Sequence, residues 1–496
     1  MLDTGTARAL ADAALSTAAR HGAAHVDFRM SRVGQVDVRV RDGLLEGAED
    51  RAGTGFGVRV VRDGTWGFAA GVRPDVDEVV RVAGLACEAA RLARPLRGDP
   101  VELADEPVYP DAEWVSPYRI DPLEVPAGER VGTLQEWSTA LLASPEVDHV
   151  LARLFAVREE KFYADSRGTT TRQRRIWLHP QVQALRLGRG DDGGPETMRT
   201  LAPPVARGFE YLTGTGWDWA GELAALPGLL AEKAAAPSVR PGHYDLVIDP
   251  TNLWLTIHET IGHATELDRV LGWEAAYAGT SFATLDQLGT LRYGSPAMTV
   301  TADRTTTHGL ASIGYDDEGV AAQSWDLIRD GLLVGYQVDR QTARLVGLNR
   351  SNGCAFADSP AHVPVQRMAN VSLSPVVDGP DTAGLIAGVR NGIYVVGDKS
   401  WSIDMQRYNF QFTGQRFYRI RDGRLSGPLR DVAYQGSTVD FWNSLEAVGG
   451  PGGYLLSGAS NCGKAQPGQL AGVSHGCPAA LFRGVRVLNT AIEAVR

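Results

Sequence analysis

Asp-Gly pairs at the ends of short apolar runs constrain the fold of this chain most strongly. One pattern, an apolar residue followed by Arg-Asp-Gly and a returning run, recurs at 40–47, 328–335 and 420–427, and the segment 62–64 supplies the same turn. Asp and Gly tolerate positive φ, so each pair predicts a tight hairpin between antiparallel strands. The spacing of the units is irregular, which indicates reused hairpins rather than a solenoid.

The first half of the chain alternates helical and strand-like patterns. Apolar residues recur at helical spacing in four segments: 5–23, 76–94, 127–144 and 217–235. Period-two or Gly-dense β patterns separate them: 35–41, 57–61, 149–156, 161–165 and 170–184. We therefore expect an N-terminal α/β domain with an antiparallel sheet and flanking helices.

The length of 496 residues exceeds what one hydrophobic core normally organises, so we expect two domains. The best linker candidate is 234–242, which contains small residues and two prolines between a helical and a strand pattern. Short strands dominate after it. The predicted fold class is α+β, with an N-terminal α+β domain at 1–236 and a β-rich, barrel- or sandwich-like C-terminal domain at 243–496.

Composition and charge exclude several classes of partner. The formal net charge of −10 attracts no phosphate backbone, so we expect no nucleic-acid partner. The N-terminus lacks a secretory pattern, and no uninterrupted apolar run is long enough for a membrane helix. Four cysteines are too sparse for a disulfide framework. We expect a cytoplasmic protein without a membrane partner.

The segment that follows the linker carries the sharpest chemical pattern. Residues 244–248 read as a buried strand, Asp249 is a good N-cap, and Pro250 suits the first position of a helix. That helix would contain His258-Glu259-Thr260-Ile261-Gly262-His263. Two histidines with a glutamate beside the first resemble the helix of zinc peptidases, in which Glu is the general base. The predicted metal-binding helix thus lies near the start of the second domain.

The spacing of the two histidines does not suit a regular helix. Zinc-peptidase histidines are usually four residues apart, whereas His258 and His263 are five apart, or about 140° on an α-helix. A π-bulge or a local break would bring them together, and we place it at Gly262. The alternative interpretation is two unrelated surface histidines beside an exposed Glu259.

A third protein ligand is needed, and Cys462 is the candidate. It lies in a Gly-rich stretch beside Lys464, which favours the thiolate. Two histidines and a thiolate leave a fourth position open, as in catalytic zinc sites. Cys477, with His475 beside it, offers a rival ligand pair.

Over essentially its whole length the chain resembles the TldD half of the TldD/PmbA (TldE) family of metalloproteases. The motifs that carry the resemblance are 55–60 (GFGVRV), 258–266 (HETIGHATE), 315–319 (YDDEG), 367–370 (RMAN), 461–464 (NCGK) and 473–476 (VSHG). The resemblance implies that His258, His263 and Cys462 bind one zinc ion per chain. A mild departure is Cys477, where many relatives carry another residue.

Roles for neighbouring residues follow as expectations. Glu259 would act as the catalytic base. Glu266 would orient His263 or remain a solvated residue of the helix. Further residues that could support the site or contact substrate are Gly262, Lys464, His475 and Arg407.

The resemblance also implies how substrate is handled. Family members of this half pair with a related subunit that lacks the metal motif, and they admit unfolded or extended peptides such as peptide precursors or antitoxins. We expect hydrolysis of such peptides by a heterodimer with a PmbA/TldE-like paralogue, or by a homodimer. The alternatives are a non-catalytic peptide-binding subunit and a metal-independent cysteine hydrolase that uses Cys462 with His475.

Overall fold

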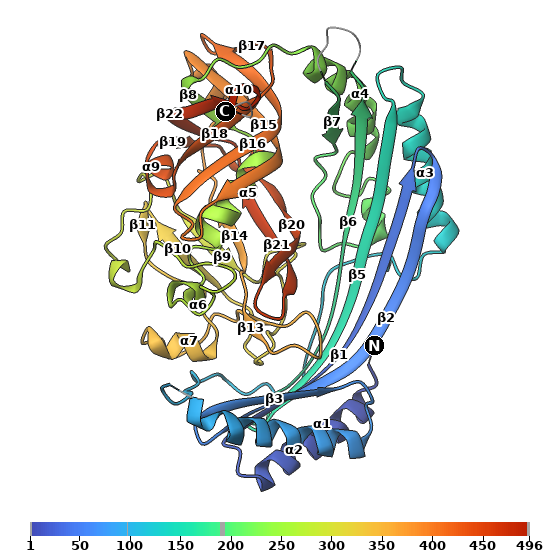
Figure 1. Cartoon of the computed structure of the whole chain (residues 1–496), viewed down its shortest axis with the longest axis vertical. Coiled ribbons are helices and arrows are strands. Elements are labelled where there is room, and N and C mark those ends of the chain that lie inside the picture. The colour runs from blue at the N-terminus through green and yellow to red at the C-terminus, as the bar shows by residue number, and fades with distance from the viewer. Residues whose placement is uncertain (1, 97, 189–193, 494–496) are drawn as a thin grey trace.

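The structure is a computed structural model that describes residues 2–96, 98–188 and 194–493. It confirms the predicted α+β class. A long, curved, mainly antiparallel sheet built from the N-terminal half runs along one side of a strand-rich C-terminal half (Figure 1). No helix among these residues has both the length and the apolar character that crossing a membrane requires.

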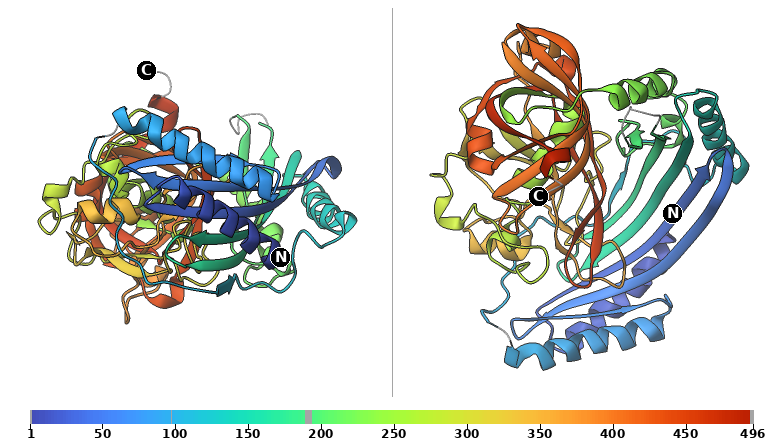
Figure 2. Two further views of the ribbon diagram at one scale, coloured as in Figure 1. Left: turned by 90° about the horizontal axis from the view of Figure 1, so that it is seen from below. Right: turned by 45° about the horizontal axis from the view of Figure 1, so that its top comes forward.

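The strands of the N-terminal sheet follow the order β3-β2-β1-β5-β6-β4, with β7 beside β6. Helices α1 and α2 cover one end of it and α3 and α4 the other (Figures 1 and 2). The elements are α1 (Thr4–Arg20), β1 (His25–Arg41), β2 (Leu44–Arg62), β3 (Thr65–Gly71), α2 (Val76–Ala93), η1 (Arg94–Leu96), β4 (Ala112–Val115), α3 (Ala127–Leu142), β5 (His149–Asp165), β6 (Thr170–Arg186), β7 (Glu196–Arg199), η3 (Phe209–Tyr211) and α4 (Trp219–Ala235).

The Asp-Gly turns form as predicted. Asp42 and Gly43 adopt φ values of 49° and 78° between β1 and β2. The turns at 63–64, 330–331 and 422–423 likewise place both residues in the left-handed region. Each joins two antiparallel strands, because its backbone twist matches that of the flanking strands.

The centre of the C-terminal half is a closed barrel of five strands. The order is β15-β8-β22-β18-β16, and β15 pairs with both β8 and β16, which closes the ring. Only the β15–β8 pair within the ring is parallel. Buried side chains from these strands form one core with the apolar face of the helix that follows β8.

A ribbon of two strands, β20 and β21, and a four-stranded sheet, β11-β10-β9-β14, pack beside the barrel. The elements of this half are β8 (Gly242–Ile248), α5 (Pro250–Ile257), the π-helix η4 (His258–Gly262), α6 (Leu267–Val270), η5 (Leu285–Gln287), β9 (Val300–Asp303), β10 (Ser324–Arg329), β11 (Leu332–Leu333), α7 (Arg340–Leu345), β12 (Ala355–Phe356), β13 (Val365–Gln366), β14 (Asn370–Leu373), α8 (Thr382–Ala387), β15 (Asn391–Ile403), β16 (Asn409–Arg421), β17 (Arg424–Leu429), β18 (Val432–Ser437), α9 (Thr438–Asn443), β19 (Leu445–Val448), η6 (Pro451–Gly453), β20 (Leu455–Lys464), β21 (Gln469–Cys477), β22 (Ala480–Asn489) and α10 (Thr490–Glu493).

Buried ion pairs hold the two halves together. Lys161 of β5 donates to both carboxylate oxygens of Asp317 at 2.8 and 3.0 Å. Arg59 of β2 donates to Glu318 at 3.0 Å. All four side chains are buried. In each pair the two charges lie on different halves and are buried. A shift of one half relative to the other would leave buried charges without a partner, so these pairs fix how the halves sit.

Candidate metal centre

The helix that carries both histidines starts as the sequence predicts. Asp249 accepts a hydrogen bond from the backbone N–H of Thr251 at 3.0 Å, and Pro250 occupies the first helical position. Leu253, Ile257 and the following Ile261 are fully buried in the core of the C-terminal half. The barrel core therefore fixes the direction in which the next turn projects its polar side chains.

The predicted helix irregularity is present. Residues His258–Gly262 form a π-helix in which the N–H of His263 donates to the carbonyl of His258 at 3.0 Å. The wider turn brings the two imidazole rings to a centroid distance of 4.6 Å. Glycine at 262 leaves room for Met368, since an added Cβ would lie 2.5 Å from its sulfur and the methionine would have to move.

Cys462 reaches the histidines from β20, beyond an irregularity in its pairing with β21. Its Sγ lies 3.5 Å from Nε2 of His263. Among the described residues, His258, His263 and Cys462 are the one group of His, Cys, Asp or Glu side chains close enough to share a metal ion, with donor atoms within 4.8 Å of one another. A tetrahedral zinc ion separates its N and S ligands by roughly 3.5 Å, and the distance between His263 and Cys462 matches this separation.

Burial and neighbouring charges favour the protonation states that a metal needs. Burial lowers the pKa of His258 and of His263, so both imidazoles are neutral near pH 7. Burial opposes ionisation of Cys462, but neighbouring positive charge, including the Arg367 guanidinium, lowers the pKa of the thiol. Neutral imidazoles and a thiolate are the forms that bind zinc.

Glu266 orients His263 from behind. Its Oε2 lies 2.8 Å from Nδ1 of His263, and its Oε1 accepts from Nζ of Lys464 at 3.2 Å. Burial of Glu266 is opposed by Lys464, His263 and Arg269, which hold the pKa of this carboxyl well below its ordinary value. A carboxylate only accepts hydrogen bonds, so His263 carries its proton on Nδ1 and directs the lone pair of Nε2 towards Cys462.

His475 of β21 orients His258 in the same way. Nδ1 of His475 lies 2.9 Å from the carbonyl oxygen of Val371, which can only accept. Burial holds the pKa of His475 well below its ordinary value, so the ring is neutral and its Nε2 accepts. The 2.7 Å contact between that atom and Nδ1 of His258 thus places the His258 proton on Nδ1. The Nε2 lone pair of His258 remains free for a metal.

Glu259 faces a cation. Nη1 of Arg407 donates to its Oε2 at 2.7 Å, and Nη2 of Arg407 donates to the carbonyl of Ala278 at 3.1 Å. Arg407 has a φ of 63° in the turn between β15 and β16. Arg407, predicted as a supporting or substrate-contacting residue, thus reaches Glu259.

Some predicted partners do not reach the centre, and others were missed. Cys477 lies near the carbonyl of Pro250, with a sulfur–oxygen distance of 3.9 Å, rather than beside His258. Cys462 contacts His263 and not His475 among the hydrogen bonds of the described residues. No role was predicted for Asp268 or Arg269, which lie two and three residues after Glu266 and pair with Lys464 and Glu266.

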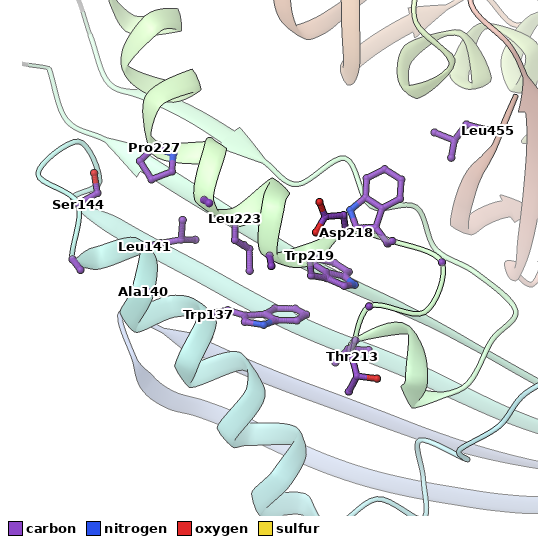
Figure 3. Close-up of a pocket in the computed structure, with 17 residues that line it drawn as sticks. Trp137, Ala140, Leu141, Ser144, Thr213, Asp218, Trp219, Leu223, Pro227 and Leu455 are labelled. Carbon is purple, nitrogen blue, oxygen red and sulfur yellow. The ribbon is translucent and has the colours of Figure 1, made fainter. Parts of the chain in front are cut away.

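A pocket of about 1290 Å³ lies away from these residues. Figure 3 shows Trp137 of α3 and Trp219 and Leu223 of α4 along its wall. None of its lining residues belongs to the predicted site.

Known proteins resemble this chain over between half and nearly all of its length. The model of the PmbA/TldA metallopeptidase C-terminal domain matches residues 241–489, and that of metallopeptidase domain 1 matches 26–90. A metalloprotease of Methanothermobacter thermautotrophicus is 28% identical over 94% of this chain and 96% of its own length. A zinc metalloprotease TldD homologue of Saccharolobus solfataricus is 27% identical over 52% of this chain and 54% of its own. TldE of Thermococcus kodakarensis has the same fold, with a TM-score of 0.71 at 16% identity over 96% of this chain and 99% of its own. The chain is a member of the PmbA/TldD family of metallopeptidases.

Proposed function

We propose that the protein is a zinc-dependent peptidase in which His258, His263 and Cys462 hold one ion and Glu259 is the catalytic base. The π-helix carries this proposal, because it turns two histidines with an unsuitable spacing towards one thiol. The name of the zinc metalloprotease TldD homologue supports the choice of metal.

Zinc, when bound, would polarise the peptide carbonyl and make water acidic enough to attack it. Glu259 would accept the proton of the attacking water and return it to the leaving amine. Arg407 engages Oε2 of Glu259, so the proton would travel on Oε1. Glu266 and His475 would keep both histidines in the ligating tautomer, and Lys464 would hold Glu266 charged.

The substrate class we propose is unfolded or extended peptide, including peptide precursors and antitoxins. The strand-rich surroundings of Cys462 suit a bound peptide strand. We further propose a dimer, either with a TldE-like subunit or with a second copy, and a reducing, cytoplasmic location that keeps Cys462 a thiol. Sedimentation of the purified chain with and without such a partner tests the assembly.

Metal analysis of the wild type beside Glu259→Gln and Cys462→Ala tests the assignment. We expect one zinc per chain and cleavage of an unfolded peptide in the wild type, zinc without cleavage in Glu259→Gln, and weakened zinc binding in Cys462→Ala. Full zinc occupancy without Cys462 would refute the ligand set. Chelator-insensitive cleavage that needs Cys462 would favour a cysteine hydrolase, and zinc without any cleavage in the wild type would favour a peptide-binding subunit.

A further inference from the structure

Three loops meet around Glu259 and Cys462. The loop 271–281 follows α6, the turn 404–408 joins β15 to β16, and the turn 465–468 joins β20 to β21. The N–H of Ala465 donates to Glu274 at 3.2 Å, which ties the first loop to the third. Arg407 ties the second loop to the first through Ala278 and to the site through Glu259. The loops therefore form one rim rather than three separate surfaces.

Backbone hydrogen bonds join the first two loops. Backbone N–H groups of Thr280 and Phe282 donate to the carbonyls of Met405 and Gln406 at 2.8 and 2.9 Å. Gly279, at a φ of 87°, allows this approach, because an added Cβ would lie 2.3 Å from the carbonyl oxygen of Met405. The rim is thus held at a set position beside Arg407.

This rim exposes three large apolar side chains. Trp273, Tyr277 and Met405 are 51%, 55% and 54% exposed. Tyr277 precedes the residue whose carbonyl binds Arg407, and Met405 lies two residues before Arg407. Exposed apolar side chains beside a charged site are typical of a surface that binds a ligand.

We infer that Tyr277 and Met405, with Trp273 beyond them, bind an apolar side chain of the peptide substrate next to the scissile bond. The inference rests on the proposed peptidase function. An extended peptide advances about 3.3 Å per residue, so a chain whose scissile bond lies at Glu259 brings its next residues to the Arg407 rim. The uncharged side chains there favour leucine or an aromatic residue over aspartate.

Binding to the zinc-loaded Glu259→Gln protein tests this inference without cleavage. Two end-capped peptides that differ only in leucine or aspartate beside the scissile bond are titrated calorimetrically. We expect the leucine peptide to bind at least about tenfold more tightly. Adding Tyr277→Ser and Met405→Ser should reduce the difference to about twofold, whereas adding Leu92→Ser, an equally exposed apolar residue on α2, should leave it unchanged.

A substitution that introduces a positive charge strengthens the test. Adding Met405→Lys should turn the preference towards the aspartate peptide, a gain that unfolding cannot produce. Equal binding of both peptides by the Glu259→Gln protein would overturn the inference, as would a preference that survives the double substitution. A changed sedimentation coefficient with unchanged peptide binding would assign the rim to a subunit contact and also overturn it. Failure of the wild type to cleave either peptide would count against the peptidase proposal alone, because binding is read separately.

Discussion

At the scale of single residues, neighbouring side chains fix the tautomers of His258 and His263. These neighbours are not themselves candidate metal ligands. His475 accepts from His258 only because Val371 occupies its other nitrogen, and Glu266 accepts from His263 only because Lys464 and Arg269 keep it charged. Each imidazole therefore presents one free lone pair without a rearrangement.

Replacing His475 should weaken zinc binding without removing a ligand. His475→Ala frees Nδ1 of His258 from its acceptor, so the ring loses both its tautomer and its orientation. We expect zinc affinity to fall by about 10- to 100-fold, measured by competition with a chromogenic chelator. Cys477→Ala is the matched control, two residues away on β21 and equally buried. Loss of zinc from Cys477→Ala instead would support the rival ligand pair.

At the scale of elements, β20 links the candidate centre to the N-terminal sheet. Cys462 lies near one end of this strand, and the hydroxyl of Ser460 lies 3.0 Å from Nδ1 of His179 on β6. Burial, with Arg199 and Arg153 nearby, lowers the pKa of His179 to about 4. The contact is therefore made by a neutral imidazole at pH 7.

Acid should weaken this contact in a defined window. His179 binds its proton at about pH 6.5 when unfolded but at about pH 4 when folded, so protons favour the unfolded state. Neutral His179 makes its full contribution to the free energy of unfolding above pH 6.5. That contribution falls by about 2 kcal/mol as the pH falls towards 4. Urea unfolding at pH 7.0 and 4.5 should show a smaller acid loss in His179→Gln than in the wild type. The exposed His149→Gln should behave as the wild type does, and equal losses in all three proteins would contradict the assignment.

At the scale of the whole molecule, buried charges decide how the halves sit. Asp317 receives Lys161 and Arg29 from the N-terminal sheet, and these cations outweigh burial and lower the pKa of its carboxyl. We propose that the chain divides into domains 1–236 and 243–496 with this network as their joint. The connecting residues 237–242 lead from the end of α4 into the first residue of β8.

Removing one charge of this buried network should lower the free energy of unfolding far more than removing a surface charge. Lys161→Met leaves Asp317 and Glu159 without their shared ammonium group. We expect a loss of about 3–5 kcal/mol in urea unfolding and earlier proteolysis within 237–242. Arg91→Met, which breaks an exposed pair with Glu88, should cost no more than about 1 kcal/mol. If a protease instead cleaves the variant first inside the long strands, the result would argue against the domain division.

The candidate site divides into parts that could and could not be predicted. The cap at Asp249, the buried face of α5 and the irregularity before His263 depend on neighbours a few residues away, so the pattern of residue types revealed them. The contacts of Arg407 with Glu259 and of His475 with His258 were not predicted, since 148 and 217 residues separate the partners. Asp268 and Arg269 were missed because a charged residue on a short helix usually faces solvent.

The Asp-Gly turns and most helix limits were determined by the sequence alone, because positive φ, capping and periodicity are local properties of the chain. Closure of the barrel was decided by tertiary structure, since β15 must pair with β8 at one edge and with β16 at the other. The approach of Cys462 to His263 across 199 residues was decided in the same way. No local energy specifies such a contact; it exists because the barrel core, the ribbon β20–β21 and the π-helix pack at the same time.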